Sequence, residues 1–146
     1  MPIEVRGLGQ ALSKLELVKR RLRARIIGLV SSHTRLMKVH ARRNAPVGEG
    51  TLKQSITSLT RGMYGAVYTP LEYAPSVEKG ADPHEIRPNQ ADALHFFWEK
   101  VGREVFFGQV DHPGQEAQGF FEDAANEIYP RMKRAVKREV RKTIGL

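Results

Sequence analysis

Apolar residues in the first 45 positions recur at intervals of three and four, which is the spacing of one helical face. The residues that share this spacing are Leu8, Leu12, Leu15, Val18, Leu22, Ile26, Leu29, Leu36 and His40. The basic residues Lys14, Lys19, Arg21, Arg23, Arg25 and Lys38 fall mostly on other faces of the helix. The pattern predicts a long amphipathic helix over residues 8–44. It should end before Pro46, because a proline disfavours helical geometry at the preceding residue.

The predicted helix is unusually long for a chain of 146 residues. At about 1.5 Å per residue it would extend roughly 54 Å, which exceeds the width of a compact domain of this size. It must either overhang the domain or bend, and Gly28 followed by Ser31 and Ser32 marks its weakest part. A bent helix would fold onto its own sheet, whereas an overhanging amphipathic helix suggests a neighbouring molecule. Both alternatives remain open.

Short β-branched and aromatic runs follow the turn-rich residues 46–50, and such runs are typical of strands. Strands are expected at residues 55–60, 63–69, 93–98 and 103–110, and they form two hairpins. The HFFW run at 95–98 is predicted to be a core strand, because it is too aromatic to lie in water. A short helix at 73–79 and a loop at 78–92 separate the two hairpins.

The remaining residues predict helices after the sheet. One apolar helical face begins at Phe120 and includes Ile128. Pro130 is expected to end this helix and begin another, because proline is favoured in a first helical turn and costly in a helix interior. The expected fold is a single α+β domain, 1–146. Its long N-terminal helix (8–44) packs on a small, mostly antiparallel four-stranded sheet (51–110), and C-terminal helices (119–143) follow.

Charge is distributed unevenly along the chain. Residues 1–45 hold eleven Lys/Arg and two acids, residues 46–129 hold six and thirteen, and residues 130–146 hold seven and one. Two basic ends therefore flank an acidic middle. Solvated helix faces explain most charge runs. A surface that faces nucleic acid and unlike faces that attract when copies pack head to tail are the functional alternatives.

Composition excludes several classes of protein. The chain has no cysteine, so it has neither a disulfide framework nor a thiolate zinc site. No window approaches the roughly 18 consecutive apolar residues that a membrane span needs. The start, MPIEVRGLGQ, lacks the charged start and the apolar stretch of a signal peptide. We therefore expect a protein that is made or assembled in the cytosol.

Candidate catalytic residues are few. His84-Glu85 and Asp111-His112 could supply metal ligands or an acid–base pair, and with the basic ends they would suggest a small nuclease. No paired-histidine metal motif, phosphate-binding glycine loop or serine elbow is present. No zinc finger or RNA-recognition motif is present either, so nucleic acid would be bound through its phosphates alone. We expect no catalytic residue, cofactor or metal.

Four short motifs occur in order between residues 8 and 128. They are Ala45-Pro46-Val47 followed by Gly50, Leu52, Ser55 and Ile56; Tyr73-Ala74 with Val77-Glu78 and Gly80; His84, Ile86 and Pro88 followed by Ala93-Leu94 and Phe96; and His112-Pro113-Gly114 followed by Gly119-Phe120 and Ala124-Ala125. This series resembles the HK97 gp10-like family of tailed-phage proteins, the tail-completion or head-to-tail joining components. Glu49, Lys79, Ala81 and Gly119 depart from the residues that are usual in that family.

The resemblance implies an α+β subunit that assembles as a homo-oligomeric ring in the neck or tail of the virion. Such a ring joins the portal or adaptor to the tail tube or tail terminator and lets DNA pass, without catalysis, cofactor or membrane contact. It is assembled in the host cytoplasm. An acidic middle between basic ends provides the unlike faces that a cyclic ring needs.

Two sets of residues are predicted to contact partners. The partner-facing loop comprises Glu78, Asp82, His84, Glu85, Arg87 and Asn89. The basic interface or DNA-facing set comprises Arg21, Arg25, Lys133 and Lys137. The alternative function is a small basic nucleic-acid-binding protein or metal-dependent nuclease. Ring copy number, and which neighbour binds which face, stay open.

Overall fold

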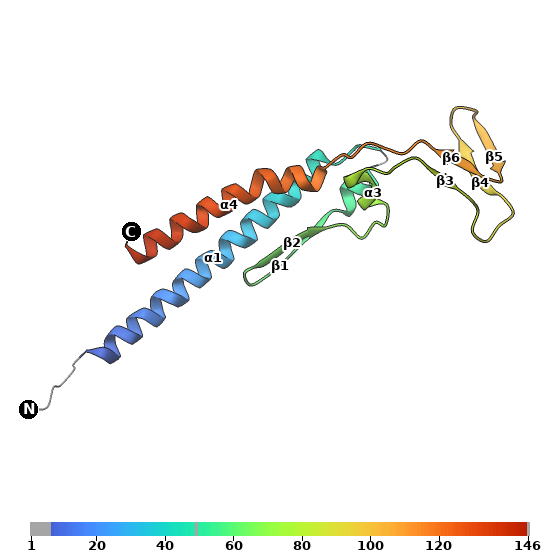
Figure 1. Ribbon diagram of the computed structural model, residues 1–146. Coiled ribbons are helices and arrows are strands. Elements are labelled where there is room, and N and C mark those ends of the chain that lie inside the picture. The colour runs from blue at the N-terminus through green and yellow to red at the C-terminus, as the bar shows by residue number, and fades with distance from the viewer. Residues whose placement is uncertain (1–6, 49, 146) are drawn as a thin grey trace, which may run out of the picture. The chain divides into compact units, whose positions relative to one another are not determined.

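The computed structural model describes residues 7–48 and 50–145 and confirms the α+β class (Figure 1). Two expectations involve residues outside these ranges. The absence of a signal peptide was judged partly from residues 1–6, and Glu49 is one of the residues that depart from the family pattern. The helices are α1 (Leu8–Asn44), α2 (Thr51–Ser55), α3 (Ala74–Lys79) and α4 (Phe120–Ile144). The strands are β1 (Thr57–Arg61), β2 (Tyr64–Tyr68), β3 (His84–Ile86), β4 (Leu94–Trp98), β5 (Arg103–Phe107) and β6 (Val110–His112).

The chain divides into two compact units. Unit 1 consists of Met1–Leu71 and Phe120–Leu146, and it therefore holds α1, α2, the β1–β2 hairpin and α4. Unit 2 consists of Glu72–Gly119 and holds α3 and the other four strands. The prediction of a single domain stays a prediction, because two compact units can belong to one domain. In the part of the chain that the structure describes, no helix combines the length and apolarity required to cross a membrane.

An antiparallel pair of helices forms the framework of unit 1. α1 is continuous over 37 residues and passes Gly28 without a break (Figure 1). α4 runs in the opposite direction along it, so that His40 of α1 lies 2.6 Å from Glu127 and Arg25 forms an ion pair with Glu139. The side chains buried in unit 1 are Val30, Thr34, Ala41, Ala45, Leu52, Ile56, Phe120, Ala124, Ile128 and Ala135. The core is therefore concentrated around the second half of α1.

The predicted break at Pro130 is wrong, because α4 is one helix of 25 residues with Pro130 inside it. A proline in a helix interior loses a backbone hydrogen bond and costs about 3 kcal/mol. Burial on both sides of it offsets this cost, since Ile128 and Ala135 both pack in the core. A salt bridge of 2.8 Å between Glu127 and Arg131 also spans the proline. Tertiary packing therefore overrides the local preference.

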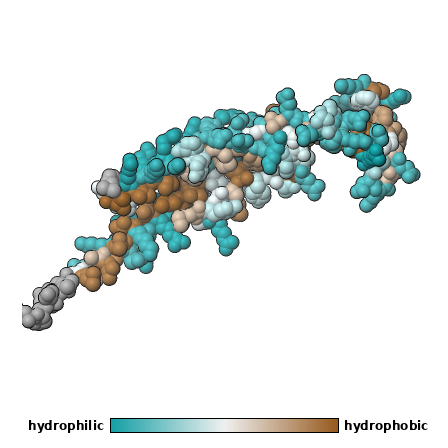
Figure 2. All heavy atoms as spheres, viewed as in Figure 1, coloured by the Kyte–Doolittle hydropathy of each residue, from teal (hydrophilic) through white to brown (hydrophobic). Residues whose placement is uncertain are grey.

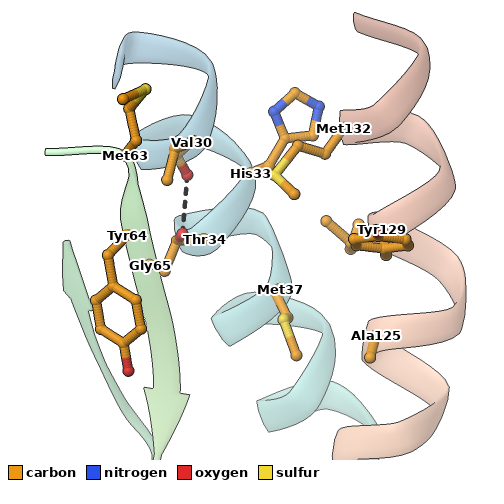
Figure 3. A pocket seen from close by; sticks show the side chains of 11 residues that line it. Val30, His33, Thr34, Met37, Met63, Tyr64, Gly65, Ala125, Tyr129 and Met132 are labelled. Carbon is orange, nitrogen blue, oxygen red and sulfur yellow. Dashed lines mark hydrogen bonds between the residues drawn. The ribbon is translucent and has the colours of Figure 1, made fainter. Parts of the chain in front are cut away.

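The β1–β2 hairpin approaches α1 closely at Gly65. A Cβ built on Gly65 would lie 2.0 Å from the hydroxyl oxygen of Thr34, so only glycine fits there. The Thr34 hydroxyl is itself held in place, because it donates a hydrogen bond of 2.8 Å to the Val30 carbonyl (Figure 3). Arg42 fixes the start of the hairpin by donating to the carbonyl of Ile56 at 3.0 Å.

Unit 2 contains α3 and two antiparallel ladders, β3–β6 and β4–β5. The isolated bridge between Ala81 and Gln115 extends the pairing beyond β3–β6. Two glycines permit this close approach. Gly80 and Gly114 both have a φ of +80°, and a Cβ on Gly114 would lie 2.4 Å from the Ala81 carbonyl oxygen.

The expected four-stranded sheet is corrected to three two-stranded sheets within the described residues. Each predicted hairpin pairs only with itself, and β1–β2 belongs to a different unit from β4–β5. The predicted strand at 103–110 ends at Phe107, and β6 starts at Val110. The predicted loop at 78–92 supplies β3, which pairs with β6 across more than 20 residues of sequence. Such a distant pairing leaves no local signal in the sequence.

The contact at Gly65 predicts that Gly65→Ala lowers the free energy of unfolding by about 1–3 kcal/mol, because the added methyl group overlaps the Thr34 hydroxyl. Gly28→Ala is the matched control, since a Cβ there meets open space on α1. It should stabilise the protein by up to about 1 kcal/mol through higher helix propensity. Urea unfolding of both variants checks the pair, and equal stabilities would contradict the close approach.

Candidate interaction surfaces

The six residues predicted as a partner-facing loop do not form one loop. His84 and Glu85 lie in β3, and the Glu85 carboxylate forms an ion pair with Arg87. Glu78 belongs to the last turn of α3, where its carbonyl accepts the Gly119 N–H at 3.0 Å. Asp82 and Asn89 are exposed on either side of the strand. The structure therefore distributes this set over a helix, a strand and two flanking turns, and their role in partner binding stays a prediction.

β3 and β6 bring the two candidate His/acid pairs together. His84 is opposite His112 with ring centroids 5.0 Å apart, and Glu85 is opposite Asp111. Because side chains alternate across a strand, the two imidazoles are on one face and the two carboxylates on the other. The four groups cannot converge on one ion. No group of three or more His, Asp or Glu in the described ranges could hold a metal.

Both imidazoles already have a backbone partner for Nδ1. His84 Nδ1–H donates to the Asp82 carbonyl at 2.9 Å, whereas His112 Nδ1 accepts the Gly114 N–H at 3.1 Å. Both bonds lie at the same end of the β3–β6 ladder, where His84 is opposite His112. They give the histidines a structural explanation that requires no ligand.

The predicted basic residues lie on α1 and α4 of unit 1. Arg21 is exposed, and Arg25 lies one turn later, where it forms the ion pair with Glu139. Lys133 and Lys137 are exposed one turn apart on α4. The structure links Arg25 to α4, which the sequence did not reveal.

Lys137 also belongs to a shallow groove lined only by cations. Its lining residues are Arg134, Lys137, Arg138, Arg141 and Lys142, and we call this the basic groove. These five side chains recur at intervals of three and four, which places them on neighbouring rows of one helix. Sequence reasoning identified Lys137 alone, although the spacing of the other four could have been recognised. The groove is suited to a polyanion.

The two units carry opposite net charges. The residues of unit 1 include twenty Lys/Arg and seven Asp/Glu, a formal charge of +13. Those of unit 2 include four Lys/Arg and nine Asp/Glu, a formal charge of −5. Opposite charges of this size favour contact between unit 1 of one molecule and unit 2 of another.

An apolar stripe is exposed along the start of α1. Every residue from 8 to 21 is exposed. The stripe consists of Leu8, Leu12, Leu15 and Val18, and we call it the leucine stripe. Leu12 and Leu15 are 55% and 62% exposed. Figure 2 shows the stripe as a brown band that extends past the end of α4. Of the two alternatives for α1, the overhanging helix is therefore the one observed.

A second apolar surface lies on the β4–β5 hairpin. The register places His95 opposite Phe106 and Phe97 opposite Glu104, so these four side chains share one face. Phe97 is 60% exposed and Phe106 is 68% exposed. We call this surface the aromatic face. The prediction of a core strand is wrong here, because HFFW has no polar alternation and a two-stranded sheet cannot cover both of its sides.

A half-open cavity of about 370 Å³ lies between α1, the β1–β2 hairpin and α4 in unit 1 (Figure 3). Met37, Met63 and Met132 line it together with Tyr64 and Tyr129. Flexible thioether side chains can adjust to irregular apolar shapes. The sequence could not predict this cavity, because its lining residues come from three separate segments.

The exposure of the aromatic face predicts that Phe97→Thr and Phe106→Thr each change the free energy of unfolding by only about 0.5 kcal/mol. Phe120→Ala should cost about 3–5 kcal/mol, because the Phe120 side chain is fully buried in unit 1. Thermal and urea unfolding compare the three variants. A large loss of stability in either threonine variant would show that the face is buried in the free protein.

No protein-family model, curated protein or solved structure matches the chain. Function is inferred from the interaction surfaces of the chain and from its sequence motifs.

Proposed function

We propose that the protein is a non-enzymatic structural subunit of a tailed-phage or prophage particle. Copies of it form a ring at the head-to-tail junction, join the portal or adaptor to the tail tube or terminator, and let DNA pass. The ordered motifs that resemble the HK97 gp10-like family support this function. The structural observation that carries the proposal is the overhang of α1, whose leucine stripe is exposed from Leu8 to Val18.

An exposed apolar helix of this kind is costly in an isolated molecule. Monomeric proteins rarely expose contiguous apolar patches, and patches rimmed by polar residues usually mark interaction sites. The leucine stripe fits this description, because Lys14 and Arg21 lie beside it on the helix. In a structural subunit the stripe would be buried against a neighbouring molecule, which removes the free-energy cost of exposing it to water.

Ring assembly also requires two unlike surfaces on each copy. Unit 1 supplies a basic surface with an apolar stripe, and unit 2 supplies an acidic surface with exposed aromatic side chains. A dimer in which one surface meets the same surface of its partner would need no difference in charge or in apolar character between the units. The division of charge between the units therefore supports a head-to-tail arrangement.

A nucleic-acid-binding protein is the second candidate, and the basic groove on α4 favours it. Five cations line the groove without an acid among them. The same groove could face DNA inside a ring. The nuclease version of this alternative has no such support, because β3–β6 places its imidazoles and carboxylates on opposite faces.

Charge reversal on α1 tests assembly. Arg21→Glu combined with Arg25→Glu should weaken assembly about tenfold or more, since it removes positive charge beside the stripe. Stability should fall by only about 1–2 kcal/mol, because the Arg25 side chain is 57% exposed although that of its partner Glu139 is 19% exposed. Mass photometry measures assembly and calorimetry the thermal transition, with Arg61→Glu as the matched control. A variant that loses its thermal transition would show that these arginines are structural.

Binding to duplex DNA at several salt concentrations tests the second candidate. Replacing Lys137, Arg138 and Arg141 with Gln should reduce the salt dependence of binding, by about 0.9 in logarithmic slope for each lost phosphate contact. Lys53→Gln, Arg61→Gln and Lys100→Gln together control for the loss of three positive charges. An equal loss in the control would contradict a specific role for the basic groove. Plasmid cleavage with magnesium that disappears in His84→Ala and His112→Ala would instead establish a nuclease.

A further inference from the structure

We propose that the aromatic face of the β4–β5 hairpin of one copy docks on the leucine stripe of α1 of the next copy. The contact joins unit 2 of one molecule to unit 1 of its neighbour. This inference rests on the proposed ring and names the contact that repeats around it.

The leucine stripe requires a partner that is apolar without being basic. Six Lys/Arg and one Glu lie between residues 8 and 25. A second α1 could match the stripe in shape, but two such helices side by side would place like charges against each other. Pairing of α1 with α1 is therefore disfavoured. A partner with excess acid and an apolar surface avoids this repulsion.

Unit 2 has both properties. Its formal charge is −5, and the aromatic face exposes Phe97 and Phe106 at diagonal positions of one sheet surface, with Glu104 opposite Phe97. On this face His95 stacks on Phe106 with ring centroids 4.4 Å apart and forms an ion pair of 3.1 Å with Glu104. An isolated two-stranded hairpin is marginally stable in water, so covering one of its faces also stabilises the hairpin itself.

The point at which the chain passes between the units favours docking of the aromatic face on a neighbouring copy over docking on the same copy. The chain leaves unit 1 after Leu71 and returns to it at Phe120, the first residue of α4. Phe120 precedes Glu127, which bonds to His40 near the end of α1. Leu15, in the leucine stripe, is 25 residues before His40, or about 38 Å away along the helix axis. The stripe therefore lies at the end of unit 1 that is remote from the junction.

A contact between two different surfaces propagates. After one copy docks on the next, the pair still has one free aromatic face and one free leucine stripe. Such heterologous contacts close into a ring when the rotation between copies permits it, and otherwise they extend as filaments. The contact ends at a dimer only if two copies exchange it reciprocally, each hairpin on the other's stripe.

Two variants that each remove one side of the contact test it. The stripe variant carries Leu12→Gln and Leu15→Gln, and the hairpin variant carries Phe97→Thr and Phe106→Thr. All four side chains are exposed, so both variants should keep the circular dichroism and melting temperature of the wild type. Each should raise the dissociation constant for self-association about 30-fold or more. Leu59→Thr, on an exposed side chain of β1, is the control that should assemble normally.

Mixing the two variants distinguishes this contact from other modes of association. The intact hairpin of the stripe variant can dock on the intact stripe of the hairpin variant, so an equimolar mixture should form a 1:1 heterodimer and nothing larger. Sedimentation velocity over about 1 to 100 μM measures the species. Absence of the heterodimer would overturn the proposed contact, as would normal assembly of either variant alone or a wild type that stays monomeric.

The outcomes also separate this contact from the proposed function. Wild-type rings that persist in both variants would overturn the contact and leave the ring standing. A heterodimer in the mixture, together with wild-type filaments that never close, would support the contact and contradict the ring.

Discussion

The antiparallel packing of α4 against the second half of α1 is the interaction on which unit 1 depends. It buries Ala41, Phe120, Ala124 and Ile128 in one core. Glu127 of α4 links the two helices, because its carboxylate lies 2.6 Å from His40 and 3.4 Å from Arg43, both in α1. α4 has 25 residues and α1 has 37, so the pairing cannot cover the whole of α1. The exposed leucine stripe is a direct consequence of this difference in length.

Unit 2 is incomplete for a different reason. Its strands form two separate ladders, of which β3–β6 has three residues per strand and β4–β5 has five. Sheets of this size are marginal without further packing. Aromatic side chains on both sides of β4–β5 exceed what unit 2 can bury. Both units therefore expose apolar surface. Their opposite charges favour contact between unit 1 of one copy and unit 2 of another over contact between like units.

Periodicity in the sequence predicted the elements better than their pairing. The bounds of α1 matched because a 3.6-residue pattern and Pro46 mark the helix locally. The β1–β2 hairpin was found because short β-branched and aromatic runs mark its two strands locally. Pro130 was misjudged, because burial of Ile128 and Ala135 decides the course of α4 and is not visible in local preferences. Pairing of β3 with β6 depends on contacts between distant residues.

The candidate surfaces were predicted only in part. Arg21, Arg25, Lys133 and Lys137 do lie on basic helix faces, but the link between Arg25 and Glu139 requires the tertiary structure. The HFFW run was assigned to a core because aromatic residues are usually buried. Burial depends on how much surface the rest of a unit can cover, and β4–β5 has only two strands. An apolar run without alternation can therefore mark an interface as well as a core.

Electron microscopy of the purified wild-type protein tests the central claim most directly, namely that the exposed surfaces are buried between copies of this chain. Grids should be prepared from the protein alone and with the neighbouring virion proteins. Closed rings of one defined copy number are the expected result. Fields that contain only compact monomers, with the neighbouring proteins present, would contradict it.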